Sequence, residues 1–326
     1  MSSKKSIANS SCLVGYTGFV GRYLADQATF SALFNSANIA GIARQNYDTL
    51  VCAAAPGSMF EANKFPDRDW AKVQGLIDDL SKVRTKRFVL ISSIAVLADF
   101  AGGDDERTTA FQEYLAYGRH RRRLEAFVEE SFANSLIVRL PALFGRGLRK
   151  NFIFDLLNPI PTMLTKAKME NMSAVLDARL VDRLRGLYAQ DPATEMLKVD
   201  RAALDADPAR AALNETVITH GFSAAQFHNR ETTYQYYDMT RLWSDICVAL
   251  QAGLRHIHLV SEPLNAARIH RRLTGRDMPE TSAHLHREDM RTKYAHLWRR
   301  EGPYLYDADT ILELLVAFFK NERRPS

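Results

Sequence analysis

Two hydroxyls and one cation in the first half of the chain are of types that together can carry out acid–base chemistry. Tyr117 and Arg121 stand four residues apart, so they share one face of a helix. A phenol ionises near pH ~10, and a fixed cation beside it favours the phenolate, which brings its pKa towards the working range of an acid–base catalyst. Ser93, at the end of an apolar run, adds a hydroxyl that can hold a substrate oxygen. On spacing alone, a core tyrosine and a solvated basic face explain these residues more simply.

The first strand of the chain leads into a glycine triplet that suits a dinucleotide. Gly15, Gly18 and Gly21 follow the apolar residues 12–14 with the spacing G-x-x-G-x-x-G and precede a helix-like run. Gly15 can make the turn, Gly18 lets the backbone approach a pyrophosphate, and Gly21 lets the helix pack on the strand. The helix N-terminus offers free N–H groups and a positive dipole end to phosphates. The predicted contacts in this loop are Gly15, Thr17, Gly18, Phe19, Val20 and Gly21.

The residues after the second predicted strand bear on which dinucleotide binds. Residues 31–34 are typical of this strand, and Asn35 and Ser36 follow it, about 20 residues past the glycines. An acidic residue at that point would bind the adenosine ribose of NAD, but no Asp or Glu is in range. Asn35 and Ser36 can bond a ribose hydroxyl without repelling a 2′-phosphate, and Arg44 is the nearest cation. The predicted cofactor is therefore NAD(P), with a preference for NADP.

Strands and helices alternate through residue 140. Residues 47–52 and 87–93 are apolar runs of the kind that a parallel sheet buries on both faces. Between them, apolar residues over 70–80 recur on one face of a helix, and Asp67 is its predicted cap. This alternation predicts an α/β fold with a Rossmann-type, doubly wound parallel sheet. Ser93 then stands at the carboxyl end of a strand, where open α/β sheets bind their ligands.

The order and spacing of these motifs resemble those of the extended short-chain dehydrogenase/reductases, the NAD-dependent epimerase/dehydratase group. The likeness covers about residues 10–155 and continues more faintly beyond them. It rests on the glycine segment 15–21, the strand and its exit at 88–96, and the segment 117–121. The segment 138–147 also looks like the R-P-x-x-x-Y-G-x-G stretch that the family places beside the nicotinamide.

The resemblance implies roles for the residues of these motifs. Ser93 and Tyr117 take the positions of the catalytic serine and tyrosine. Arg121 replaces the family lysine, which binds the ribose hydroxyls and lowers the pKa of the tyrosine. An arginine keeps the charge and the donors, but it is bulkier and does not release its proton. Ile94 and Ala95 stand where sugar-nucleotide dehydratases carry an Asp-Glu pair, so we reject dehydration.

Three functions remain. The leading hypothesis is an NAD(P)-dependent oxidoreductase acting on a carbonyl or a secondary alcohol of a nucleotide-linked sugar. In it Tyr117 is the acid–base, Ser93 holds the substrate oxygen, and Arg121 clamps the ribose and modulates the pKa of the phenol. The first alternative is an NAD(P)-dependent sugar-nucleotide epimerase, which returns the hydride to the same substrate. The second is a non-catalytic NAD(P)-binding sensor or assembly protein, which the arginine substitution keeps open.

Further residues are expected around the cofactor and the substrate. Residues 53–55 allow a flat ligand to pass over the end of a strand, although close helix–sheet packing explains them equally well. Asn151 suits a phosphate or a sugar, or caps a helix, and Arg241 suits a diphosphate, or forms a surface salt bridge. The expected cofactor contacts beyond the glycine loop are Asn35, Ser36, Ala53, Ala54, Ala55, Ser92, Tyr117, Arg121 and Pro141. The expected substrate contacts are Ser93, Tyr117, Asn151 and Arg241.

The chain is long enough for two lobes. We assign residues 1–157, completed by about 234–262, to a dinucleotide-binding Rossmann domain. Residues 158–233 and 263–326 form a smaller, mostly helical lobe that binds the substrate. Its first part is the least family-like, so substrate specificity is expected there. Asp307 is the predicted cap of a final helix whose apolar stripe is either core or the contact of a homodimer.

Composition argues against other classes of protein. The net charge of +5 sits in arginine clusters typical of solvated helix faces, which favours a small-molecule substrate over nucleic acid. No apolar run approaches the ~20 residues needed to cross a bilayer, and residues 1–6 lack the apolar part of a secretory signal. Cys12, Cys52 and Cys247 lie far apart, and the histidines form no metal pattern. We therefore expect a cytoplasmic protein with no metal and no membrane partner.

Overall fold

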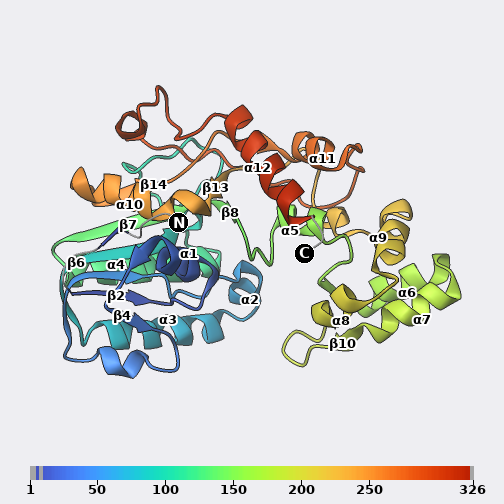
Figure 1. Ribbon diagram of the computed structural model, residues 1–326, viewed down its shortest axis with the longest axis horizontal. Coiled ribbons are helices and arrows are strands. Elements are labelled where there is room, and N and C mark those ends of the chain that lie inside the picture. Colours follow the sequence, from blue (N-terminus) through green and yellow to red (C-terminus); the bar gives the residue numbers. More distant parts are fainter. Residues whose placement is uncertain (1–4, 7–9, 324–326) are drawn as a thin grey trace. The chain divides into compact units, whose positions relative to one another are not determined.

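The computed structural model describes residues 5–6 and 10–323 (Figure 1). The chain divides into two compact units. Unit 1 comprises residues 1–148, 234–263 and 287–314, and unit 2 comprises residues 149–233, 264–286 and 315–326. Residues 287–314, which the sequence assigned to the substrate lobe, are thus part of unit 1. Residues 1–4 of the basic N-terminal segment lie outside the described residues.

Unit 1 is built on a six-stranded, fully parallel sheet in the order β14-β7-β6-β5-β2-β4. Its strands are β2 (Ser11–Val14), β4 (Ala32–Phe34), β5 (Asn46–Cys52), β6 (Arg84–Ser93), β7 (Ser135–Leu140) and β14 (His256–His258). All residues of β2 and β7 are buried, as expected for a sheet covered on both faces. The predicted Rossmann-type α/β fold is confirmed.

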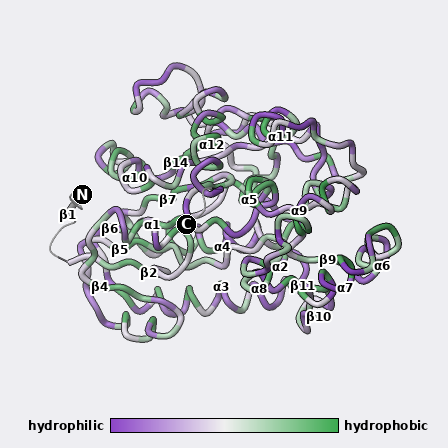
Figure 2. Tube along the Cα trace, turned by 45° about the vertical axis from the view of Figure 1, so that its right-hand side comes forward, coloured by the Kyte–Doolittle hydropathy of each residue, from purple (hydrophilic) through white to green (hydrophobic). Residues whose placement is uncertain are grey.

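Helices cover the two faces of this sheet. The helices of unit 1 that flank it are α1 (Phe19–Gln27), α2 (Met59–Lys64), α3 (Pro66–Leu80), α4 (Ala116–Ser131) and α10 (Leu242–Gln251). α1 packs against α10, and α3 packs against α4. Figure 1 shows α10 on one side of the sheet and α3 on the other. Val73, Leu76 and Leu80 form the buried face of α3, and Figure 2 shows hydrophobic and hydrophilic residues alternating along this helix.

The start of α3 differs from the prediction. α3 begins at Pro66, whose fixed φ suits the first helical position, so its cap is Phe65 and not Asp67. Asp67 instead lies in the first turn, where a negative charge is favoured by the helix dipole. The sequence reasoning also missed α2, a helix of six residues whose N-cap Ser58 accepts a hydrogen bond from the Glu61 amide.

Short strands outside the central sheet and a final helix complete the list of elements that begin in or border unit 1. β1 (Lys5–Ser6) pairs with β3 (Ala28–Thr29), and β8 (Ala142–Phe144) pairs in parallel with β13 (Tyr236–Asp238). β12 (Thr233–Tyr234) and β15 (Leu264–Asn265) lie where the chain passes between the units. α12 (Ala308–Glu322) is capped by Asp307, whose Oδ1 accepts from the Thr310 amide at 2.7 Å, as predicted.

Unit 2 has a hydrophobic core of its own. Its helices are α5 (Phe152–Leu157), α6 (Lys166–Val175), α7 (Ala178–Gly186), α8 (Arg201–Ala206), α9 (Arg210–Thr219) and α11 (Ala266–Thr274). α11 begins after Asn265 and ends at Gly275, which adopts the left-handed conformation. A small antiparallel sheet, β10-β11-β9, was not predicted. Its strands are β9 (Met163–Leu164), β10 (Tyr188–Gln190) and β11 (Leu197–Val199), too short for a recognisable alternation.

Among the described residues, no helix is both long and apolar enough to span a bilayer.

Candidate active site

The carboxyl edge of the central sheet brings together predicted site residues from five segments. Gly15, Asn35, Ala53 and Pro141 directly follow β2, β4, β5 and β7, and Ser93 ends β6. Within each group the register aligns the ends, because Val14 pairs with both Phe34 and Cys52, and Ser93 pairs with Leu140. Cys52 pairs with Leu90, so β6 and β7 extend three residues beyond β5 at this edge. The order of the strands therefore places the glycine loop and the serine at the same edge, where open α/β sheets bind ligands.

The glycine loop is held by backbone contacts. Gly15 has φ +89°, and its amide donates to the Phe34 carbonyl at 2.7 Å. A Cβ on Gly15 would lie 2.6 Å from the Ala53 carbonyl oxygen, and one on Gly21 would lie 2.0 Å from the Gly15 oxygen. Only glycine fits at these two points. Ala53 thus contacts the loop through its backbone, which favours the packing explanation of the alanines that follow β5.

The outer side of the loop is open. A Cβ on Gly18 would meet only the Gly15 oxygen, at 3.3 Å, and Thr17 and Gly18 are exposed. Gly18 is also the N-cap of α1 and supplies no side-chain acceptor to the first turn. The amides at the start of α1 and the positive end of its dipole therefore remain available to a phosphate group.

The predicted ribose-binding residues form a tight turn after β4. The Asn35 side chain accepts from the Ala37 amide at 2.9 Å and donates to the Tyr16 hydroxyl at 3.3 Å. Ser36 is exposed. Arg44 precedes β5, and its amide donates to the Lys82 carbonyl. This places Arg44 at the amino edge of the sheet, so the nearest cation of the sequence argument lies at the end opposite the glycine loop.

The start of α4 packs directly on the turn that follows β6. A Cβ on Gly118 would lie 2.0 Å from the Ala95 carbonyl oxygen, in the 3-10 turn η2 (Ile94–Val96). The amide of Tyr117 donates to Asn63 Oδ1 at 2.9 Å, which fixes α4 to α2. With its backbone held in this way, the Tyr117 side chain lies close enough to Ser93 for the serine hydroxyl to favour the ionised form of the phenol. The structure thus joins the two hydroxyls that the sequence placed in one site.

Arg121 lies against Tyr117, as their spacing in α4 predicts. Its guanidinium carbon stands 4.1 Å from the centroid of the Tyr117 ring, and the side chain is 2% exposed. Arg121 Nη1 and Nη2 both donate to the Asp69 carboxylate, and Nη2 also donates to the Pro56 carbonyl. The predicted ribose clamp is therefore a guanidinium whose terminal nitrogens are already bonded within the protein.

The expected fall in the pKa of Tyr117 is not what the structure gives. Burial raises the pKa of Tyr117 above its ordinary value, although the Arg121 charge and the nearby Ser93 hydroxyl act in the opposite direction. The Asp69 carboxylate adds to the rise. The sequence argument took the charge of Arg121 into account. It did not include the burial of the Tyr117 phenol or the Asp69 carboxylate that is bonded to Arg121.

Asp69 was missed by the sequence reasoning. It is 6% exposed, and its Oδ2 also bonds His120 Nδ1 at 2.8 Å. The signal was present, because Asp69, Val73, Leu76 and Leu80 together form the buried face of α3. A charged residue on the apolar face of an amphipathic helix requires a buried partner.

A second buried cluster lies across β6, β7 and β14. The register places Ser92 beside Arg139 and Arg139 beside His258. Glu125 of α4, which is fully buried, accepts from Ser92 Oγ at 2.6 Å and from Arg139 Nη2 at 2.7 Å. Arg139 Nη1 meets His258 Nε2 at 3.2 Å. The hydroxyl of Ser92, a predicted cofactor contact, is thus bonded to a carboxylate within the protein.

Burial lowers the pKa of His258 to about 3, and the positive charge of Arg139 acts in the same direction. The ring is therefore neutral at physiological pH. Its Nδ1 is 2.9 Å from the Arg291 carbonyl, so this nitrogen carries the proton and Nε2 accepts from Arg139. The cluster is a hydrogen-bonded network of one buried carboxylate, one buried guanidinium and one neutral imidazole.

The two predicted substrate contacts outside this edge have structural partners. Asn151, with φ +94°, is the N-cap of α5 in unit 2, and its Oδ1 accepts from the Ile153 and Phe154 amides. Arg241 in unit 1 is 46% exposed and lies 3.6 Å from the buried Asp245. These contacts match the structural alternatives of the sequence analysis, and the substrate roles stay predictions.

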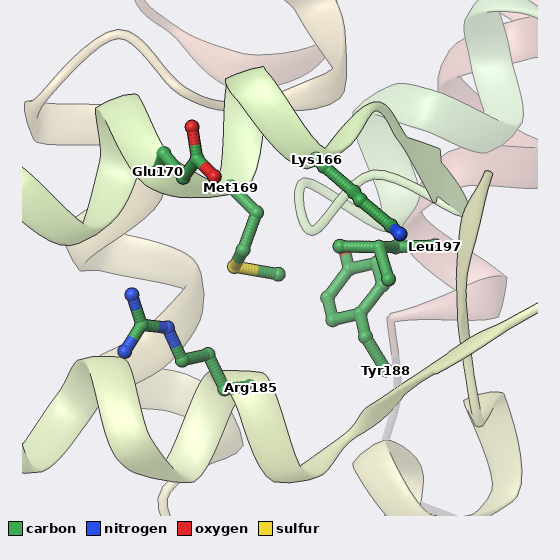
Figure 3. Close-up of a pocket in the computed structure, with 6 residues that line it drawn as sticks. All are labelled: Lys166, Met169, Glu170, Arg185, Tyr188 and Leu197. Carbon is green, nitrogen blue, oxygen red and sulfur yellow. The ribbon is translucent and has the colours of Figure 1, made fainter.

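Unit 2 also contains a cavity of about 330 Å³. Its lining comes from the small sheet and the two helices beside it, namely Lys166, Met169, Glu170, Arg185, Tyr188 and Leu197. Figure 3 shows the Met169 side chain between Arg185 and the pair formed by Lys166 and Tyr188. The Tyr188 hydroxyl donates to the Pro161 carbonyl at 2.5 Å, so its proton is already used in a hydrogen bond within the protein.

The fold was compared with proteins of known sequence and structure. No protein-family model matches the chain, and no curated protein matches it by sequence. The structure is similar to a UDP-N-acetylglucosamine 4-epimerase from Methanobrevibacter ruminantium, with 12% identity and a TM-score of 0.60 over 95% of this chain and 97% of that one. It is also similar to a dTDP-4-dehydrorhamnose reductase from Bacillus anthracis in complex with NADP, with 12% identity and a TM-score of 0.60 over 98% and 99%.

A third solved structure, RMD from Pseudomonas aeruginosa complexed with NADPH, has 14% identity and a TM-score of 0.57 over 96% and 99% of the two chains. The fold is that of the extended short-chain dehydrogenase/reductases. The resemblance found in the motifs is thereby confirmed for the whole fold, since the matches span both units and not the first 155 residues alone.

Proposed function

We propose that this protein is an NAD(P)-dependent oxidoreductase that acts on a carbonyl or a secondary alcohol. The observation that carries the proposal is that Ser93 and Tyr117 lie close together, with Arg121 over the phenol ring, at the sheet edge that also holds the glycine loop. Such a pair of hydroxyls can hold a substrate oxygen and exchange a proton with it. The extended short-chain dehydrogenase/reductase fold supports the same reading.

The glycine loop fits a dinucleotide. Its inner side is closed by backbone contacts at Gly15 and Gly21, and its outer side, at Gly18, leaves room for a pyrophosphate next to the α1 N-terminus. A bound nicotinamide dinucleotide would supply or accept a hydride. We propose NADP as the preferred form, because no carboxylate stands among residues 35–38 after β4 to repel a 2′-phosphate. Arg44, at the opposite edge, contributes nothing to this preference.

In the proposed reaction Ser93 donates a hydrogen bond to the substrate oxygen and Tyr117 donates its proton to that oxygen during reduction. The reverse reaction returns the proton to Tyr117. Arg121 supplies a positive charge beside the ring and so stabilises the phenolate that reduction leaves behind. Ile94 and Ala95 are buried in η2 and carry no acid or base, which supports excluding dehydration.

The proposed substrate is a nucleotide-linked sugar. The similar structures include an enzyme named for a UDP-sugar and one named for a dTDP-linked sugar. An epimerase that returns the hydride to the same sugar is the second candidate, because one of the similar structures is named as an epimerase. Absorbance of retained nicotinamide in the purified protein would favour the epimerase, and its absence together with net consumption of NADPH would favour the reductase.

Turnover and binding are tested separately. The purified protein is titrated with NADP and with NAD, and NADPH oxidation is then followed with a panel of nucleotide-linked keto sugars. Tyr117→Phe should keep dinucleotide affinity and lose at least ~100-fold in kcat, because it removes the proton and leaves the backbone contacts of α4 intact. The matched control is Tyr114→Phe, since Tyr114 is three residues away and 90% exposed. It should leave both measurements unchanged.

The non-catalytic alternative rests on one observation, namely that Asp69 and Pro56 occupy the terminal nitrogens of Arg121. It predicts that NADP binds and that no member of the panel is turned over or interconverted. A protein that binds neither dinucleotide would overturn both this alternative and the proposed reaction.

A further inference from the structure

We propose that Asp69 is a positioning residue for this site: its carboxylate fixes the Arg121 guanidinium against the Tyr117 ring and offsets the charge that the ring experiences. The inference rests on the proposed function, since it concerns the same phenol. It assigns a role to a helix, α3, that carries none of the predicted site residues.

The geometry holds the guanidinium from several sides. Arg121 Nη1 and Nη2 both donate to Asp69, so the acid binds the planar group at two points. The Pro56 carbonyl, in the segment after β5, accepts from Nη2 as well. Among the described residues, Arg121 Nε is buried without a hydrogen-bond partner. A guanidinium bonded in this way has its plane and its distance from the ring set by Asp69.

The charge balance follows from that arrangement. Arg121 is 2% exposed and Asp69 is 6% exposed, so water screens their fields weakly. The cation lies 4.1 Å from the ring centroid, and the Asp69 anion is hydrogen-bonded to that same guanidinium. The phenol therefore experiences an ion pair and not a lone cation. A lone arginine would stabilise the phenolate more strongly than this pair does.

The Arg121–Asp69 ion pair is the main source of charge near Tyr117, because the other groups around the ring are neutral, exposed or part of the same cluster. On α4, His120 is bonded to Asp69 and belongs to the same cluster. β6 contributes the neutral Ser93, and α2 contributes the neutral Asn63. The charged residues of α2, Glu61 and Lys64, are exposed and therefore screened.

The test is a spectroscopic titration of Tyr117 that needs no substrate. The chain has 12 tyrosines, so the tyrosinate absorbance of each protein is compared with that of the same protein carrying Tyr117→Phe, and the difference reports Tyr117 alone. Asp69→Asn should lower the pKa of Tyr117 by about one to two pH units, because it leaves the cation unopposed. Asp69→Glu keeps the charge and should stay close to the wild type.

The matched control is Asp67→Asn, which removes an exposed carboxylate two residues earlier on the same helix and should leave the titration unchanged. Asp69→Asn leaves a buried cation with one partner fewer, so this variant is at risk of unfolding. The double variant Asp69→Asn/Arg121→Gln removes both charges and should instead raise the pKa of Tyr117 above that of the wild type.

An unchanged Tyr117 titration in both the single and the double variant would overturn the inference, as would shifts of the same sign in the two. If only the double variant folds, a raised pKa of Tyr117 in that variant supports the inference, and an unchanged pKa overturns it. Failure of the proposed function looks different: the wild type would then transfer no hydride to any substrate of the panel, while the titrations could still shift in opposite directions.

Discussion

The glycine loop and the first turns of α4 meet at one edge of the sheet, but different contacts hold them. The loop is fixed by backbone atoms, with Gly15 against Ala53 and Gly21 against Gly15. The α4 segment is fixed by buried charges, with Arg121 bound to Asp69 and Glu125 bound to Arg139. The comparison teaches that backbone contacts of this kind can be recognised from a short sequence pattern. The buried ion pairs cannot, because they depend on partners far along the chain.

The largest expected effect is on the backbone side of the comparison. Gly21→Ala places a Cβ 2.0 Å from the Gly15 carbonyl oxygen, so α1 has to move away from β2. We expect the free energy of unfolding to fall by about 4 kcal/mol in a urea titration. Gly75→Ala is the control, because this exposed glycine of α3 has nothing within 4 Å of its added Cβ. It should gain about 0.5–1 kcal/mol, and similar losses in both variants would remove the steric argument.

The second largest loss of unfolding free energy is expected from the buried charges around α4. Glu125→Gln leaves Arg139, which is 2% exposed, without its ionic partner and weakens the bond to Ser92. The free energy of unfolding should fall by about 3 kcal/mol. Glu130→Gln changes an exposed glutamate five residues later on the same helix and should have almost no effect. If the two variants were equally stable, the cluster would contribute little and the comparison would fail.

The same cluster predicts a dependence of stability on pH. The pKa of His258 is about 3 in the folded protein, because burial and Arg139 disfavour its charged form. The unfolded chain binds this proton near pH ~6.5, so the free energy of unfolding is highest above that pH and falls as the pH drops towards 3.

Between pH ~6.5 and ~5 the loss should be about 2 kcal/mol. Denaturant titrations at several pH values measure it, and His258→Gln should remove this part of the slope. A slope that is the same in the wild type and in this variant would show that the buried ring is not its source.

The smallest effect should come from an ion pair near the surface. Arg241 is 46% exposed and 3.6 Å from Asp245, which keeps hydrogen bonds from Tyr237 and Trp298. Arg241→Gln should cost about 0.5 kcal/mol of unfolding free energy, against ~3 kcal/mol for a buried charge. The KM for a nucleotide-linked sugar is measured on the same variant: a marked increase would support the predicted diphosphate contact, and an unchanged KM would leave Arg241 a structural residue.

The comparison also explains which parts of the molecule the sequence revealed. The triplet at 15–21, the exit of β6 at Ser93 and the spacing of Tyr117 and Arg121 are local patterns, and the structure places them where strand order requires. The partners of Arg121 lie 52 and 65 residues away in the chain, so no local pattern could join Asp69 or Pro56 to Arg121. The pattern of α3 indicates only that Asp69 needs a buried partner. The pKa of Tyr117 was expected to move in the wrong direction for this reason, because burial and the distant anion are both tertiary properties.

Unit 2 shows a second limit of predicting structure from the sequence. Its strands β9, β10 and β11 have two or three residues each, which is fewer than the roughly four residues over which alternation can be recognised. The sequence therefore predicted a mostly helical lobe and none of these three strands. Asn151 shows the same ambiguity at the level of one residue, since a helix cap and a substrate contact call for the same side chain.

The close approach of Gly118 to the Ala95 carbonyl affects how far the amino-acid sequence of this fold can change. It fixes the separation of Ser93 and Tyr117 through main-chain atoms, and main-chain atoms do not change when side chains are substituted. A lineage can thus replace most of its residues while the two hydroxyls keep their spacing, provided that this glycine persists. That tolerance fits a fold that superimposes on proteins sharing only 12–14% of its residues.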